Sequence, residues 1–310
     1  MSGHREFLDD DVRMARYREA IEQLVTPNDI VLDLGSGTGI LAFLACAAGA
    51  RKVYAIEQQH IADLAAFLTR HLGMSDRITI LHDKSFDLEL PERANVLVTE
   101  TMGTFGLDEG ILGSIIDARK RLLTPDAKII PQRLTLSLIP VDAPKLFARY
   151  VDWWKQPRLG FDLAPVHVFA SNTMYVTDVD ASTYLATPAD ILSLDLATID
   201  DANVIGETTF ITTRAGTLHG FAGWFTATLA PNLTLSNAEP RATHWHQAFF
   251  PLQEAVAVAE GTTINVALES RDGAAWRWRG TVGGEAFDQT TYLANPPCVR
   301  GTVPPEPSTP

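Results

Sequence analysis

Three glycines at alternate positions follow a short apolar run and constrain the fold of this chain more than any other feature. The apolar run extends from Ile30 to Leu34, and Gly35, Gly37 and Gly39 come directly after it. An apolar run of this length predicts a buried strand, and glycines let the backbone turn sharply and approach a ligand closely. The alanine- and leucine-rich segment that follows predicts a helix, so this stretch predicts the first strand–turn–helix unit of a nucleotide-binding α/β domain.

Two acidic residues bear on the ligand of this turn. Asp33 precedes the first glycine, which disfavours a phosphate and favours a positively charged or hydroxyl-bearing ligand. Glu57 ends the next apolar run, about 20 residues downstream, where a strand-end carboxylate holds a ribose diol. Together these features resemble the nucleotide half of a class I S-adenosylmethionine-dependent methyltransferase. The run from Gly37 to Ala42 also satisfies the dinucleotide pattern G-x-G-x-x-A, so a dehydrogenase that binds NAD(P) and a glycine turn without a ligand remain alternatives.

Strand and helix patterns alternate through the first 131 residues. Such alternation predicts a parallel sheet with helices on both faces, with ligands bound beyond the carboxyl ends of the strands. Gly35, Glu57 and Glu100 all lie at predicted strand ends and should therefore converge. The predicted helices are 5–25, 40–48, 61–72 and 108–123, and the predicted strands after the first are 51–57, 77–81, 94–99 and 128–130.

The pattern changes at residue 132. Apolar residues then recur with period two, and threonine, tryptophan and phenylalanine are frequent, which predicts an antiparallel β-barrel domain over 132–294. A mixed, partly helical segment interrupts it at about 144–180. Residues 295–310 have many prolines and no apolar period, which predicts a disordered tail. The expected fold class is thus α/β, with residues 1–131 as a Rossmann-like, class I methyltransferase domain.

Composition narrows the partners and the compartment. The formal net charge of −13 over 310 residues disfavours nonspecific nucleic-acid binding. No apolar stretch is long enough to span a bilayer and the N-terminal residues lack a secretory signal, so we expect a cytoplasmic protein without membrane contact. The two cysteines, Cys46 and Cys298, indicate neither a disulfide framework nor a zinc site, and we expect no metal.

A glycine-broken loop after the predicted strand 94–99 carries a glutamate at each end, Glu100 and Glu109. Two carboxylates on one loop can hold a guanidinium, whose five donors lie in one plane. Such a clamp would offset the repulsion between a guanidinium and a cationic methyl donor, which is roughly 4 kcal/mol at 4 Å for an effective dielectric constant near 20. A histidine such as His244 could take the proton as the new bond forms.

The chain resembles the protein arginine N-methyltransferase family to about residue 285. The two glutamates together with the Thr-His-Trp loop are far more specific than the glycine motif, which all class I methyltransferases share. The similar segments are the cofactor motif at 32–41 and 48–53, the double-glutamate loop with Glu100 and Glu109, the loop Thr243-His244-Trp245, the cofactor-covering helix at 4–13 and the start of the dimerisation arm at 153–162.

This resemblance implies transfer of a methyl group from S-adenosylmethionine to an arginine guanidino group of a protein or peptide, by a homodimer. In the family, the helix arginine binds the cofactor carboxylate and the helix aspartate pairs with the loop histidine. We therefore expect Glu100, Glu109, His244 and Asp10 as catalytic residues, Arg13, Asp33, Gly35, Gly37, Glu57 and Asp87 as cofactor-binding residues, and Phe7, Met102 and Trp245 as substrate-binding residues.

Three departures from the family pattern qualify the expected chemistry. Thr101 and Thr104 stand where the family often has Trp and Tyr, which predicts a roomier pocket. The family's adenine-binding acid has no direct match, and Asp87 is the candidate. Phe7 occupies a position that is phenylalanine in members making monomethyl or symmetric products, and it favours such a product here. A methyltransferase of free arginine or another small guanidino compound, and a scaffold without activity, remain alternatives.

Overall fold

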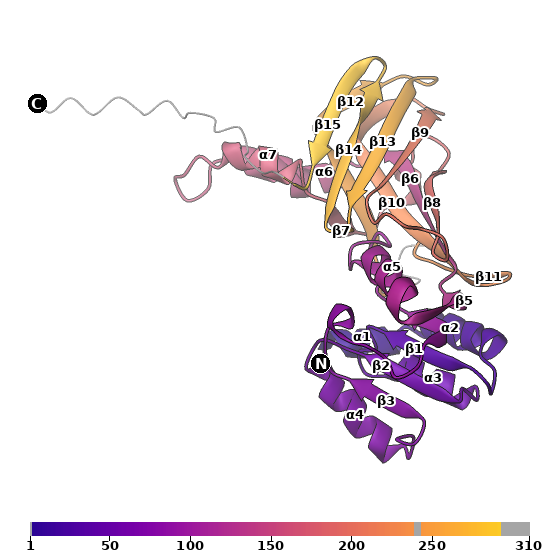
Figure 1. Cartoon of the computed structure of the whole chain (residues 1–310). Coiled ribbons are helices and arrows are strands. Elements are labelled where there is room, and N and C mark those ends of the chain that lie inside the picture. Colours follow the sequence, from indigo (N-terminus) through magenta and orange to yellow (C-terminus); the bar gives the residue numbers. More distant parts are fainter. Residues whose placement is uncertain (1, 239–242, 293–310) are drawn as a thin grey trace, which may run out of the picture.

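The computed structural model describes residues 2–238 and 243–292, and the expected tail at 295–310 lies outside these ranges. The chain forms two lobes, each built on β-sheet structure, and α5 (Ile111–Arg121) lies at the junction between them (Figure 1). Within the described ranges, no helix combines the length and the apolarity needed to cross a lipid bilayer.

The N-terminal part is built on a five-stranded parallel sheet, as the alternating pattern predicted. Its strand order is β3-β2-β1-β4-β5, so the order reverses between β1 and β4 and places the ligand site above these two strands. Helices α3 (Ile40–Ala47) and α4 (Ile61–His71) connect the first three strands. The strands are β1 (Ile30–Leu34), β2 (Lys52–Ile56), β3 (Ile78–Leu81), β4 (Ala94–Thr99) and β5 (Leu123–Ile130).

The edge strand and the first predicted helix differ from the structure. Strand β5 begins at Leu123 rather than Lys128. It is an edge strand of the sheet, and an edge strand tolerates Pro125 because one side of it has no neighbouring strand that needs a backbone N–H donor. The helix predicted over 5–25 is broken into α1 (Ser2–Asp9) and α2 (Asp11–Leu24). The break occurs because the Asp10 carboxylate caps α2, with Oδ1 accepting from the backbone N–H of Arg13 at 2.9 Å.

The glycine turn between β1 and α3 needs its glycines for backbone reasons. Gly35, Gly37 and Gly39 have φ values of 74°, 52° and 85°, in the left-handed region that other residues rarely adopt. Asp33 lies fully buried beneath this turn, where its Oδ2 accepts from the N–H of Ala42 at 2.9 Å. Its Oδ1 has no hydrogen-bond partner in the described part of the chain. Asp33 thus fixes the start of α3 from below and, contrary to our expectation, does not line the ligand cavity.

The C-terminal part consists of two antiparallel sheets that form a barrel-like domain (Figure 1). Aromatic residues fill the space between the sheets, with Trp278, Phe221 and Phe249 fully buried. One sheet has the order β7-β12-β10-β6-β8 with β11 paired to β10, and the other has the order β15-β14-β13-β9. Their bounds are β6 (Arg133–Val141), β7 (Tyr175–Thr177), β8 (Ala189–Asp195), β9 (Val204–Ile211), β10 (Gly216–Ala230), β11 (Leu233–Ser236), β12 (Gln247–Val258), β13 (Thr263–Arg271), β14 (Ala275–Val282) and β15 (Glu285–Thr290).

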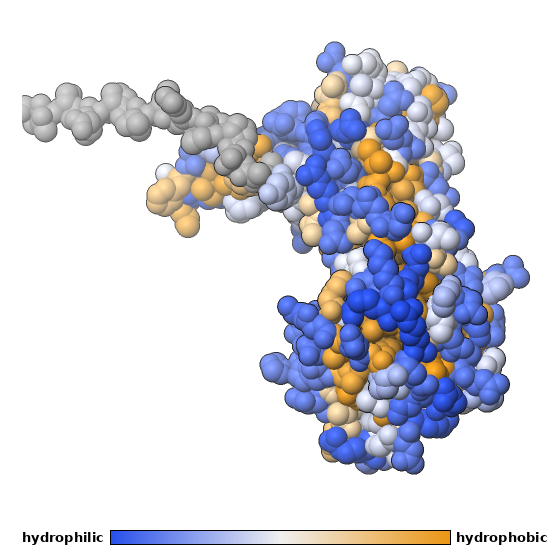
Figure 2. Space-filling view, in the orientation of Figure 1, coloured by the Kyte–Doolittle hydropathy of each residue, from blue (hydrophilic) through white to orange (hydrophobic). Residues whose placement is uncertain are grey.

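A helical arm, residues 144–180, projects from the side of this domain (Figure 1). It contains α6 (Pro144–Tyr150), short 3-10 turns at Asp152–Lys155 and Ala164–Val166, and α7 (His167–Ala170). Leu159 is 97% exposed and Phe161 is 69% exposed, and Figure 2 shows apolar surface on the arm. The end of the arm thus presents two large apolar side chains at the surface.

Burial makes Asp33 a source of pH-dependent stability. Burial raises the pKa of Asp33 to about 7, with the nearby Glu57 charge adding to the rise. Because the folded-state pKa lies above that of the unfolded chain, the stability associated with protonated Asp33 is complete below about pH 4 and is lost as the pH rises to about 7. We expect Asp33→Asn, which keeps an acceptor for Ala42, to raise the melting temperature relative to the parent chain by a margin that grows between pH 4 and 7. A margin independent of pH, measured by calorimetry across this range, would contradict the buried carboxyl as its source.

Candidate active site

A cavity of about 720 Å³ opens above the carboxyl ends of the parallel strands, where the two domains meet. Nine of the residues expected to bind or react line it, and they come from four separate parts of the chain. These residues are Phe7 and Arg13 from the N-terminal helices, Gly35, Gly37 and Glu57 from the first two strand ends, Glu100 and Glu109 from the loop after β4, and His244 and Trp245 from the antiparallel domain.

The glycine-turn side of the cavity presents backbone and hydroxyl groups. Both oxygens of Glu57 accept backbone N–H groups, Oε2 from Gly37 at 2.9 Å and Oε1 from Gln59 at 2.7 Å. These bonds fix the carboxylate and leave lone pairs for hydroxyl donors. The hydroxyl of Ser36 is buried at the same wall and has no hydrogen-bond partner among the residues that the structure describes. An unpartnered buried hydroxyl beside a fixed carboxylate fits a ribose-bearing ligand.

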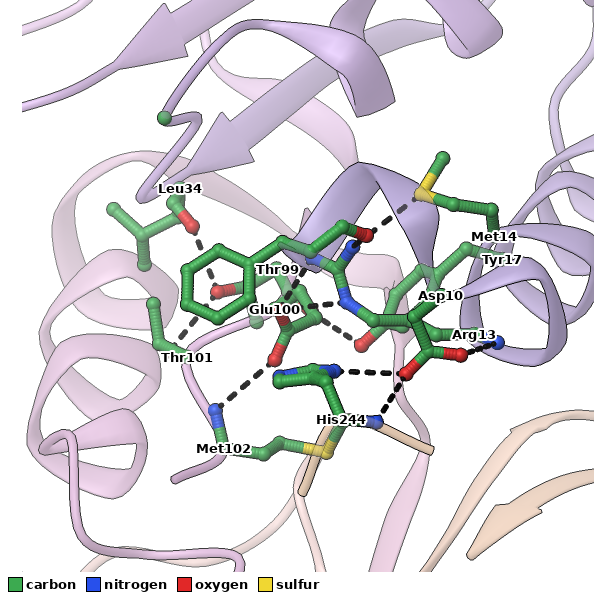
Figure 3. A network of polar contacts seen from close by, with 12 residues as sticks. Asp10, Arg13, Met14, Tyr17, Leu34, Thr99, Glu100, Thr101, Met102 and His244 are labelled. Atoms are coloured by element: carbon green, nitrogen blue, oxygen red, sulfur yellow. Dashed lines mark hydrogen bonds and ion pairs between the residues drawn. The ribbon is translucent and has the colours of Figure 1, made fainter. Parts of the chain in front are cut away.

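Arg13 and Glu100 pair with each other in this structure. The guanidinium of Arg13 donates through Nε to Glu100 Oε2 at 2.9 Å, Nη2 binds the same oxygen, and Nη1 donates to the carbonyl of Phe7 at 2.8 Å (Figure 3). Arg13 is only 5% exposed. The structure therefore brings the residue expected to hold the cofactor and the residue expected to hold the substrate into contact, and Glu100 here accepts a guanidinium from its own chain.

Glu109 is the second carboxylate of the loop, and no hydrogen bond or ion pair to its side chain occurs within residues 2–238 and 243–292. Burial raises its pKa, and the charges of Glu100 and Asp108 raise it further. The helix expected over 108–123 begins instead at Ile111, because Gly110 adopts a left-handed conformation with φ of 74°. Glu109 therefore projects from the loop into the cavity rather than from a helix.

Two residues that the sequence analysis did not select hold this loop in place. Asp108 accepts from the N–H of Phe105 at 2.7 Å and from Nε1 of Trp276, in the antiparallel domain, at 3.1 Å. Burial raises the pKa of Asp108 to about 6. The fully buried Asn237 donates through Nδ2 to the carbonyls of Thr104 at 2.8 Å and His246 at 2.7 Å. Asn237 thereby links the glutamate loop to the loop that carries His244.

Asp10 connects the N-terminal helices to the antiparallel domain. Its Oδ2 accepts from the backbone N–H of His244 at 2.8 Å and lies 2.8 Å from Nδ1 of the same residue (Figure 3). Burial acts to raise the pKa of Asp10, but the hydrogen bonds from His244 and Arg13 outweigh it and leave the pKa lowered. The imidazole of His244 is thus held against a charged carboxylate, with its ring 4.8 Å from that of Phe7.

The remaining expected residues lie near the cavity without lining it. Met102 is fully buried behind the glutamate loop. Asp87 ends the 3-10 turn Ser85–Asp87, whose other two residues do line the cavity. His4 also lines the cavity, and its ring approaches within 3.6 Å of the position that a Cβ on Gly37 would take. The only sequence signal for His4 was its place in the predicted cofactor-covering helix at 4–13.

Two family models match the chain, and the boundary between the matched ranges falls where the parallel sheet gives way to the antiparallel sheets. Residues 132–282 match the family model of the arginine methyltransferase oligomerization subdomain. Residues 18–130 match the family model of the ribosomal protein L11 methyltransferase. The second match covers the parallel sheet, and the first covers all of the antiparallel domain except its last strand.

The similar proteins agree with one another. Protein arginine N-methyltransferase 6 of Danio rerio is 33% identical over 277 residues, which is 84% of this chain and 79% of that one. A probable protein arginine N-methyltransferase 6 of Arabidopsis thaliana is 32% identical over 72% of this chain, although the match spans only 53% of the plant protein. A solved PRMT1 enzyme–prozyme heterotetrameric complex of Trypanosoma brucei with AdoHcy superposes with a TM-score of 0.83 at 25% identity, covering 93% of this chain and 96% of that one. The chain belongs to the protein arginine N-methyltransferase family.

Proposed function

We propose that this protein transfers a methyl group from S-adenosylmethionine to a guanidino nitrogen of arginine in a protein or peptide. One observation carries the proposal. Two glutamates and a carboxylate-bound imidazole, contributed by both domains, line one cavity above the glycine turn. We further propose that residues 1–131 and 132–294 are the two domains, because the parallel sheet ends at Ile130 and the antiparallel sheets begin at Arg133.

The cavity wall fits S-adenosylmethionine, which would supply an electrophilic methyl on a sulfonium. Gly35 and Gly37 leave room for its close approach, and Glu57 with the unpartnered Ser36 hydroxyl suits its ribose. Arg13, which is buried at the cavity wall, suits the carboxylate of S-adenosylmethionine. Asp87 stays our candidate for the adenine contact, since the turn that it ends lines the cavity.

The two glutamates would bind the substrate guanidinium in its planar geometry. Their charges offset the repulsion from the sulfonium, which is roughly 4 kcal/mol at 4 Å for an effective dielectric constant near 20. A guanidinium also relieves the repulsion that raises the pKa of Glu109. His244, held by Asp10, is placed to accept the released proton or to fix the clamp, and alignment of the displacement supplies the rest.

Removing the charge of Glu109 is the direct test. We expect Glu109→Gln to lower kcat/KM for arginine peptides at least 100-fold, because the neutral amide cannot balance two neighbouring cations. Binding of S-adenosylhomocysteine, measured by calorimetry, should change less than threefold. Glu260→Gln, which removes one negative charge at an exposed turn, is the matched control and should retain full activity. Full activity of Glu109→Gln would refute the clamp.

We also propose a monomethyl or symmetric dimethyl product. The ring of Phe7 lies against the ring of His244 and within 5.7 Å of the Arg13 guanidinium carbon, so it narrows the cavity beside the clamp. A flexible thioether in its place would leave room for a second methyl on the same nitrogen.

The product proposal predicts a switch on substitution of Phe7. Phe7→Met is expected to introduce asymmetric dimethylarginine, as measured by fragmentation mass spectrometry of the peptide product, while the parent chain makes none. Asymmetric dimethylarginine from the parent chain itself would contradict the assignment of Phe7.

The arm supports a further proposal, that the protein acts as a homodimer. Leu159 and Phe161 at its end are largely exposed. Phe67 on α4 and Leu72 directly after it would offer apolar surface on the cofactor-binding part of a second copy. The matched family model describes this region as an oligomerization subdomain.

Self-association can be measured without an assay of activity. Replacing Leu159 and Phe161 together by serine should shift the protein from dimer to monomer in light scattering at micromolar concentration, since it removes the apolar contact. Serine at the exposed Tyr292 is a control outside the arm. A parent chain that is monomeric at these concentrations would contradict the proposal.

A further inference from the structure

The turn between β13 and β14, residues 272–274, lies on the glutamate loop from the opposite domain. A Cβ on Gly273 would meet the carbonyl oxygen of Leu107 at 1.9 Å, so only glycine allows this approach. Trp276, four residues along the same hairpin from Asp272, donates to Asp108. The position of the turn relative to Glu109 is therefore fixed by contacts on both sides.

Asp272, at the tip of this turn, lines the same cavity as Glu109 and His244. Its backbone φ is 50°, and its Oδ1 lies 3.0 Å from the position of a Cβ on Gly113, in the first turn of α5. The missing side chain at Gly113 leaves space for the carboxylate at the rim. Within residues 2–238 and 243–292, the Asp272 carboxylate has no hydrogen bond or ion pair.

Two arginines, one beside Asp272 in the sequence and one buried in the cavity wall, are paired with other carboxylates. Arg271, its neighbour in sequence, pairs with Glu269 at 3.0 Å. Arg13, the buried cation of the cavity, pairs with Glu100. The cavity lining thus carries, besides the two glutamates, an exposed negative charge on Asp272.

We propose that Asp272 is a specificity-determining residue that binds a second positive charge of the acceptor. This inference rests on the proposed function, since it assumes that arginine enters toward Glu109. Each residue of an extended peptide spans about 3.3–3.6 Å, so a lysine or arginine one or two positions from the acceptor can reach the rim. The favoured substrates are accordingly peptides in which a basic residue flanks the acceptor arginine.

A structural role for Asp272 makes a different prediction. A carboxylate beside the first turn of a helix favours the helix through its dipole and its free N–H groups. If that were its only role, loss of the charge would lower stability and affect all acceptors equally. The two roles can therefore be distinguished by whether the substitution changes the ratio of kcat/KM between acceptors with and without a flanking positive charge.

The test compares Asp272→Asn with the parent chain and with Glu260→Gln as an exposed-charge control. Asparagine tolerates the left-handed conformation at this position, so the turn is preserved. The acceptors are a pentapeptide with arginine between glycines, the same peptide with lysine beside the arginine, and free arginine, whose ammonium group offers the same chemistry. Anisotropy of the labelled peptides with S-adenosylhomocysteine measures binding independently of turnover.

We expect Asp272→Asn to lower kcat/KM about 5- to 10-fold for the lysine-flanked peptide, through KM, with less than a twofold change for the glycine-flanked one. High salt should produce a similar loss in the parent chain. Asp272→Lys should prefer a glutamate-flanked peptide. Equal effects on both peptides, or a loss confined to free arginine, would overturn the proposal. If no acceptor were methylated, the proposed function would fail, and the anisotropy ratio between the two peptides would still decide whether Asp272 recognises the flanking charge.

Discussion

The site depends on one buried carboxylate that serves both domains. Asp10 caps α2 through Oδ1 and accepts from the backbone and ring of His244 through Oδ2. Loss of such a cap alone costs about 1 kcal/mol, and loss of the second oxygen would leave a backbone N–H and an imidazole without their acceptor. Because the same side chain ends one helix, starts the next and binds the facing loop, the position of the imidazole is set by the fold of the N-terminal helices.

The cavity stores electrostatic repulsion that a cationic ligand can relieve. Burial raises the pKa of Glu109, and the charges of Glu100 and Asp108 raise it further. Arg13 forms an ion pair with Glu100. Rigid supports, including Asn237 and the indole of Trp276, prevent the carboxylates from moving apart. A fixed excess of negative charge is what a site for two neighbouring cations requires, since donors and acceptors that are already in place need no reorganisation.

Sequence patterns predicted the parallel sheet and the change to antiparallel strands near residue 132, and nine of the residues expected at the site line the cavity. The patterns failed where tertiary contacts decide. The helical periodicity of 5–25 does not indicate the break at Asp10, nor that the carboxylate which caps α2 also binds His244, 234 positions away. Asn237 and Asp272 have no local motif, since their roles arise only when two domains meet. The length of β5 depended on its being an edge strand, which the pattern around Pro125 does not show.

Asp33 illustrates why a residue of a recognised motif can lie outside the cavity lining. In a glycine turn the backbone faces the ligand, so the side chain just before it is free to point downward and hold the helix, as Asp33 does through Ala42. The same reasoning explains why the run from Gly37 to Ala42 also matched a dinucleotide pattern, because both ligand classes need a close backbone approach. The two glutamates and the imidazole that follow β4 in the chain distinguish the two ligand classes. The imidazole belongs to the antiparallel domain, which the glycine motif does not predict.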